Sequence, residues 1–168
     1  AFMKKGIGVG IEDFRKIIRE DCYYFDKTNY IEELLKDKTV IKLFTRPRRF
    51  GKTLNMSTLK YFFDIKNAEE NRKLFKDLYI EKSEYFKEQG QYPVIFITLK
   101  DFKKNTWEEM NFEIKELLRN LYDEFNFIRD TLSISDLREF DKIWLKEEDA
   151  NYDSSLLNLT KYLYNYYK

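Results

Sequence analysis

The strongest constraint on this chain is a short basic segment, RPRRFGKT at residues 46–53, which lies between two apolar segments of different periodicity. The preceding segment, Thr39–Thr45 (TVIKLFT), is rich in β-branched residues and predicts a buried β-strand. The following segment, Thr53–Phe63, has apolar residues at helical spacing and predicts an amphipathic helix. A strand, a loop that ends in Gly-Lys-Thr and a helix, in this order, are the parts of a phosphate loop.

Each position of such a loop has a chemical reason. Backbone N–H groups at the start of the helix bind phosphate oxygens, and Gly51 lets the backbone come close to them. Lys52 would place its charge on the β- and γ-phosphates of ATP, and the Thr53 hydroxyl would bind Mg²⁺. The pattern departs at its first glycine, which is Arg46 here, although Pro47 restricts the backbone at that point. The predicted nucleotide-binding residues are Arg46, Pro47, Arg48, Arg49, Phe50, Gly51, Lys52, Thr53 and Leu54.

The rest of the chain alternates predicted helices with one further predicted strand. Tyr92–Leu99 (YPVIFITL) is apolar almost throughout, as expected for a strand covered on both faces. Thr106 and Glu109 have the spacing of a capping box and begin a long helix that ends near Phe125. The other predicted helices are Ile11–Glu20, Asn29–Lys36, Asp136–Lys146 and Ser155–Tyr167.

This alternation predicts an α/β fold, a three-layer sandwich with a mostly parallel sheet. Only two strands are evident, and a stable sheet needs more, so the sequence indicates an incomplete, helix-rich N-terminal portion. We expect a single domain, with residues 1–38 as a helical N-terminal segment and residues 39–168 as the start of the phosphate-loop core.

Composition excludes several other functions. A chain of 168 residues suffices for one domain, and its net charge of +1 provides no global field for nucleic acid or an anionic membrane. It has no histidine, so it has no Ser-His-Asp triad and no histidine metal site. A single cysteine, Cys22, fits a reducing compartment. The sequence also has no apolar run long enough for a bilayer, and we expect a cytoplasmic protein.

Three segments around the loop carry a resemblance to a known family. GIEDFRKI at 10–17, YYFDKTNYIEELL at 23–35 and RPRRFGKT followed by LNMSTLKYFF at 54–63 resemble a family of prokaryotic proteins called AAA-ATPase-like. The match continues more loosely through YPVIFITLKDF at 92–102. In that family arginine replaces the first loop glycine as a rule, so the resemblance implies that Arg46 is a family trait.

The resemblance also implies what this chain would lack. Family members carry an acidic Walker B strand after a helix that looks like LLNLTKYLYNYY at 156–167, so the chain would end just before that strand. The full-length protein would be an ATPase, and the 168 residues alone would be inactive. Members often continue into a nuclease-like domain of the PD-(D/E)XK type, through which a nucleic acid could be a partner.

Two minor candidates leave alternatives open. Asp26-Lys27-Thr28 could cap the helix that begins at Asn29, or could hold the N-terminal segment against the nucleotide, with Tyr23 or Tyr24 near the base. Asp101 could be a Walker B acid, but the favoured interpretation is that it caps the end of the predicted strand or starts the following turn.

A second functional hypothesis is a non-enzymatic module. In it the arginines of the RPRR loop bind nucleic acid or a partner protein in place of a nucleotide. This hypothesis predicts an oligonucleotide affinity that falls steeply with salt, with the slope reduced by about one for each arginine removed.

Overall fold

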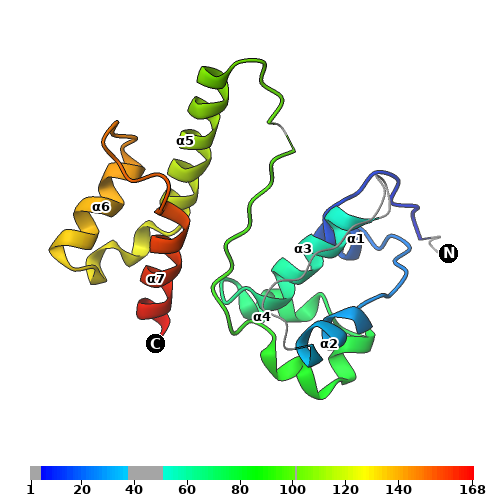
Figure 1. Cartoon of the computed structure of the whole chain (residues 1–168). Helices are drawn as coiled ribbons and strands as arrows, with labels where there is room; N and C mark the ends of the chain where they lie inside the picture. Colours follow the sequence, from blue (N-terminus) through cyan, green and yellow to red (C-terminus); the bar gives the residue numbers. More distant parts are fainter. Residues whose placement is uncertain (1–4, 38–50, 101) are drawn as a thin grey trace. The chain divides into compact units, whose positions relative to one another are not determined.

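The computed structural model describes residues 5–37, 51–100 and 102–168 of the chain. The chain forms two compact units, Ala1–Phe96 and Ile97–Lys168. Helices dominate the described part of both units (Figure 1).

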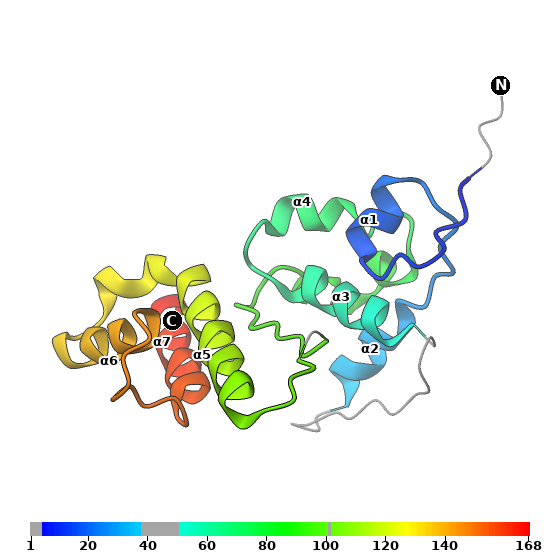
Figure 2. The same ribbon diagram turned by 90° about the horizontal axis from the view of Figure 1, so that it is seen from above.

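The first unit is a cluster of short helices around an aromatic core. Its elements are α1 (Phe14–Arg19), α2 (Asn29–Lys36), α3 (Lys52–Phe63), α4 (Ala68–Lys73) and the 3₁₀ helices η1 (Tyr79–Lys82) and η2 (Glu84–Glu88). Phe14, Phe62 and Phe75 are fully buried, and the Phe75 ring lies 5.1 Å from that of Phe14 and 5.4 Å from that of Phe62. Such ring pairs stabilise a core beyond the area they bury. Figure 2 shows α1 and α4 beside α3, which is therefore the central helix of this unit.

The second unit packs three helices and a 3₁₀ turn. These are α5 (Trp107–Glu124), η3 (Asn126–Thr131), α6 (Ile134–Trp144) and α7 (Ser155–Tyr167). Its core is centred on Tyr122, whose ring lies 4.7 Å from that of Phe140 and whose buried hydroxyl donates to the carbonyl of Ser155 at 2.6 Å. The Thr106 side chain accepts from the Glu109 amide at 3.2 Å, which confirms the predicted cap of the long helix.

The predicted helices are confirmed with small shifts at their ends. The segment expected at Asn29–Lys36 is α2, and the segment expected at Ser155–Tyr167 is α7. The helix expected at Ile11–Glu20 is shorter, because Asp13 caps it and Phe14 is its first residue. The helix after the phosphate loop begins at Lys52, one residue earlier than predicted.

The predicted three-layer sandwich with a parallel sheet is wrong. Residues 5–37, 51–100 and 102–168 form helices and irregular segments, with no strand among them. In the segment predicted as a strand, Tyr92 forms an isolated bridge with Asp64, donating to the Phe63 carbonyl and accepting from the Ile65 amide. Pro93 has no N–H with which to extend a ladder. The other predicted strand, Thr39–Thr45, lies outside the described residues.

None of the helices in the described ranges is both long enough and apolar enough to cross a membrane.

Candidate functional site

The first residues of α3 are the part of the predicted phosphate loop that the structure describes. Gly51 stands immediately before the helix in the left-handed conformation, with φ 72° and ψ 17°. A Cβ built on Gly51 would meet no described atom within 4 Å, so within the described residues the backbone angle is the constraint that favours glycine here. The left-handed residue turns the chain into the helix, whose first backbone N–H groups have no acceptor within the helix.

The two polar residues of the motif lie at this helix start. Lys52 and Thr53 are exposed, and Leu54 is half-buried on the side of the unit's core. The Asn55 amide closes the first turn by donating to the Gly51 carbonyl at 2.9 Å. The structure thus brings Gly51, Lys52, Thr53 and Leu54 together, while the predicted residues Arg46, Pro47, Arg48, Arg49 and Phe50 lie outside the described ranges.

The segment that contains α1 is fixed to α3 by side-chain hydrogen bonds. The buried Phe14 amide, at the start of α1, donates to the Ser57 hydroxyl at 2.9 Å, and that hydroxyl lies 3.0 Å from the Leu54 carbonyl. One carboxylate oxygen of Asp13 caps α1, and the other accepts from the Tyr61 hydroxyl at 2.7 Å. Ser57 and Tyr61, the α3 residues in these two contacts, are four residues apart and lie on one face of the helix. The helix that follows the predicted loop therefore also supports the N-terminal segment.

A second contact joins α2 to the first turn of α3. The Tyr30 hydroxyl donates to the backbone carbonyl of Asn55 at 2.7 Å. Burial raises the pKa of the Tyr30 phenol well above its ordinary value, so this group stays protonated to a higher pH than an exposed tyrosine. The neighbouring Tyr24 ring packs edge-on against Phe14 at 5.4 Å, and burial, aided by the charge of Asp26, raises its pKa to about 12.

The tripeptide Asp26-Lys27-Thr28 binds η1. One Asp26 carboxylate oxygen accepts from the amide and hydroxyl of Thr28, at 2.8 and 2.7 Å, and the other accepts from the Tyr79 amide at 2.7 Å. The fully buried Thr28 hydroxyl accepts from the Ile80 amide at 3.1 Å. Thr28 occupies the N-cap position of α2 without a side-chain capping bond, so the capping role expected from the sequence is replaced by a tie to η1.

Contact of this segment with a nucleotide base stays a prediction for Tyr24, Asp26, Lys27 and Thr28. Tyr24 is directed toward the core, whereas the flanking rings of Tyr23 and Phe25 are exposed. Lys27 is exposed, and its ammonium lies 5.9 Å from the Phe25 ring.

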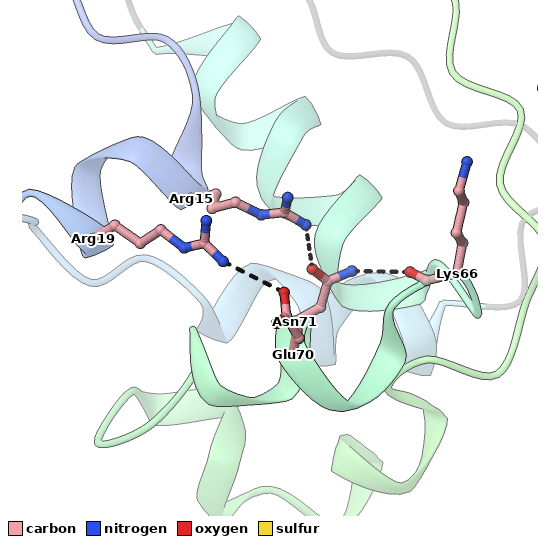
Figure 3. A network of polar contacts seen from close by, with 5 residues as sticks. All are labelled: Arg15, Arg19, Lys66, Glu70 and Asn71. Carbon is pink, nitrogen blue, oxygen red and sulfur yellow. Dashed lines mark hydrogen bonds and ion pairs between the residues drawn. The ribbon is translucent and has the colours of Figure 1, made fainter.

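A polar network joins α1 to α4 within the first unit (Figure 3). The Arg15 guanidinium donates to the Asn71 side chain at 2.6 Å and lies 4.5 Å from the Tyr61 ring, and Asn71 in turn donates to the Lys66 carbonyl at 3.3 Å. Arg19 pairs with Glu70 at 3.5 Å. These arginines therefore hold helices together, and the polar atoms of the buried Asn71 are satisfied.

Sequence reasoning missed Tyr30, Ser57 and Tyr61 as residues that support the loop helix. A signal exists for Ser57, because it and Thr58 are hydroxyl residues between the apolar Met56 and Leu59, and the structure shows that both are buried. For the two tyrosines the sequence carries no such signal, since a phenol on an apolar face can equally point to solvent.

In the described ranges, no three or more Asp, Glu or Cys side chains gather as a metal-binding group. The Mg²⁺ ligand role predicted for Thr53 stays a prediction, and with nucleotides Mg²⁺ is usually bound by few protein groups together with phosphate oxygens and water. The exposed hydroxyl at the second helical position fits that role.

Together these features define a candidate anion-binding helix start, supported by an N-terminal segment that packs on the same helix. The comparisons with known proteins show the family of the chain. The chain belongs to the AAA-ATPase-like family, described as predicted AAA-ATPases, whose family model matches residues 8–168. The family resemblance inferred from the sequence is thereby confirmed.

One curated relative, "Uncharacterized protein in vnfD 5'region" of Azotobacter chroococcum mcd 1, is 43% identical over 61 residues. That alignment covers 36% of this chain and 12% of the relative, so the chain spans only a small part of that protein's length. No solved structure matches the chain.

Proposed function

We propose that this chain binds ATP with Mg²⁺ at the N-terminus of α3, as part of an AAA-type ATPase. The observation that carries the proposal is that α3 begins at Lys52, directly after a glycine in the left-handed conformation. The first backbone N–H groups of a helix have no acceptor within it, so at the start of α3 they would be available to phosphate oxygens. Family membership supports the same function.

Three groups of this chain would bind the phosphates and the metal ion. The helix N-terminus would solvate the phosphates, and the positive end of its dipole favours anions there. The exposed Lys52 would add a point charge on the β- and γ-phosphate oxygens, and the Thr53 hydroxyl would be a Mg²⁺ ligand. The metal ion, when bound, neutralises charge that develops on the phosphate oxygens. The predicted contacts of residues 46–50 would complete the loop.

Lys52→Ala tests the proposal directly. We expect calorimetry to show MgATP binding weakened by about ten- to a hundredfold, because a lost charged hydrogen bond is worth roughly 1.5–3 kcal/mol. Lys60→Ala is the matched control, since it removes the same charge from the last turn of the same helix. Equal affinity of wild type and Lys52→Ala for MgATP, or an equal loss in both variants, would overturn the proposal.

A further inference from the structure

Tyr30 reaches the first turn of α3 from outside that helix. Its hydroxyl donates to the carbonyl of Asn55, and the amide of the same residue donates to the carbonyl of Gly51. Asn55 is thus bound at both of its backbone polar groups, by a phenol on α2 and by the left-handed glycine before α3. Because the phenol fixes the carbonyl of the residue whose amide closes the first turn, the position of the phenol bears on the geometry of this turn.

The segment that precedes Tyr30 is itself bound to η1. Two residues before it, Thr28 is fully buried and bound to Asp26 and to the Ile80 amide, so the backbone entering α2 is anchored to η1. The Tyr30 amide donates to the Lys27 carbonyl at 3.1 Å. The phenol is therefore presented to α3 by a segment with little freedom of its own, which is what a positioning group requires.

We propose that Tyr30 is a positioning residue for the phosphate site, which it holds in a binding-competent geometry through Asn55 and Gly51. The inference rests on the proposed function, and it adds that the Asp26–Tyr30 segment and the bound nucleotide are energetically coupled. Since such coupling is reciprocal, the Asp26–Tyr30 segment strengthens nucleotide binding, and the bound nucleotide in turn stabilises this segment.

Tyr30→Phe removes the hydroxyl and keeps the ring. We expect the Kd for MgATP to rise by about three- to tenfold, as the loss of one net hydrogen bond would give. The matched control is Tyr61→Phe, which also removes a phenol bond of 2.7 Å between α3 and its neighbours, but in the last turn of the helix. The control is expected to change the Kd by less than about twofold, since it lies far from the helix start.

Hydrogen exchange of the wild-type chain gives a readout that does not depend on any variant. MgATP should slow amide exchange in α2 as well as at the start of α3, and Tyr30→Phe should abolish the effect on α2. Any of three results would overturn the inference. These are unchanged MgATP affinity in Tyr30→Phe, an equal loss of affinity in both tyrosine variants, and no protection of α2 amides by MgATP in the wild type. These results leave the proposed function intact if Lys52 still matters for binding. A wild type that does not bind MgATP would instead overturn both.

Discussion

At the scale of single residues, the positive φ angle of Gly51 limits which residue types this position tolerates. With φ at 72°, alanine would be forced into the left-handed region at a cost of about 1–2 kcal/mol, whereas asparagine adopts that region more readily. We therefore expect Gly51→Ala to lose more MgATP affinity than Gly51→Asn, because the strained variant would shift the start of α3. Calorimetry on both variants makes the comparison.

The same pair separates two explanations for the glycine. If Gly51 were needed only for the close approach of phosphate, asparagine would be at least as harmful as alanine, because its side chain is larger. An affinity of Gly51→Asn for MgATP that is equal to or lower than that of Gly51→Ala would contradict the conformational explanation.

The residues of the motif and the residues that support it differ in how far the sequence predicts them. Gly51, Lys52 and Thr53 are predicted because their spacing is a local pattern that the helix start preserves. Tyr30 and Ser57 act through partners 25 and 43 residues away in the sequence, and no local pattern encodes such a contact. Whether Lys52 and Thr53 contact a nucleotide stays a prediction.

At the scale of elements, a buried hydroxyl makes one of the hydrogen bonds that join the α1 segment to α3. Removing the Ser57 hydroxyl leaves the Phe14 amide buried without its acceptor, which costs about 1–3 kcal/mol. Ser57→Ala should therefore speed amide exchange in α1 and lower the free energy of unfolding of the first unit. Lys76→Ala changes an exposed side chain of the same unit and should shift that energy by less than about 0.5 kcal/mol.

Hydrogen exchange is suited to this test because it reports on each helix separately. Protection of α1 amides in Ser57→Ala as strong as in wild type would show that the hydroxyl is not what fixes α1 to α3.

The elements also show why helices were predicted better than the sheet. A helix satisfies its backbone hydrogen bonds within itself, so the spacing of apolar residues and a cap such as Thr106 suffice to place it. A strand needs a partner, which an apolar run does not supply. Tyr92–Leu99 is apolar enough for a strand, yet in the described ranges only Tyr92 of this segment forms a bridge, and Pro93 follows it.

At the scale of the whole molecule, the described residues of the two units form hydrophobic cores of different construction. The core of the first unit is dominated by phenylalanine rings and aliphatic residues of short helices. The core of the second unit is organised by a buried phenol, since the Tyr122 hydroxyl binds the Ser155 carbonyl at the start of α7. Burial raises the pKa of this phenol well above its ordinary value, so it remains a donor at neutral pH.

Both tryptophans, Trp107 and Trp144, belong to the second unit, which allows its stability to be followed separately. The Trp144 indole N–H donates to Asp123 at 2.9 Å, and the Arg129 guanidinium lies 4.7 Å from the Trp144 ring. Unfolding of this unit breaks both contacts and should therefore change tryptophan fluorescence.

The effect of Phe140→Ala on stability can be measured by tryptophan fluorescence. Phe140 is fully buried between Tyr122 and Tyr162, so its truncation should lower the free energy of unfolding seen by tryptophan fluorescence by about 3–5 kcal/mol. Phe112→Ala is the matched control, because this phenylalanine is 59% exposed on α5 and should cost less than about 1 kcal/mol. If the two variants unfold at the same urea concentration, the second unit does not have its core at Phe140. If only Phe140→Ala unfolds early, the fluorescence transition can serve as the stability reference for this unit, against which substitutions in the first unit are compared.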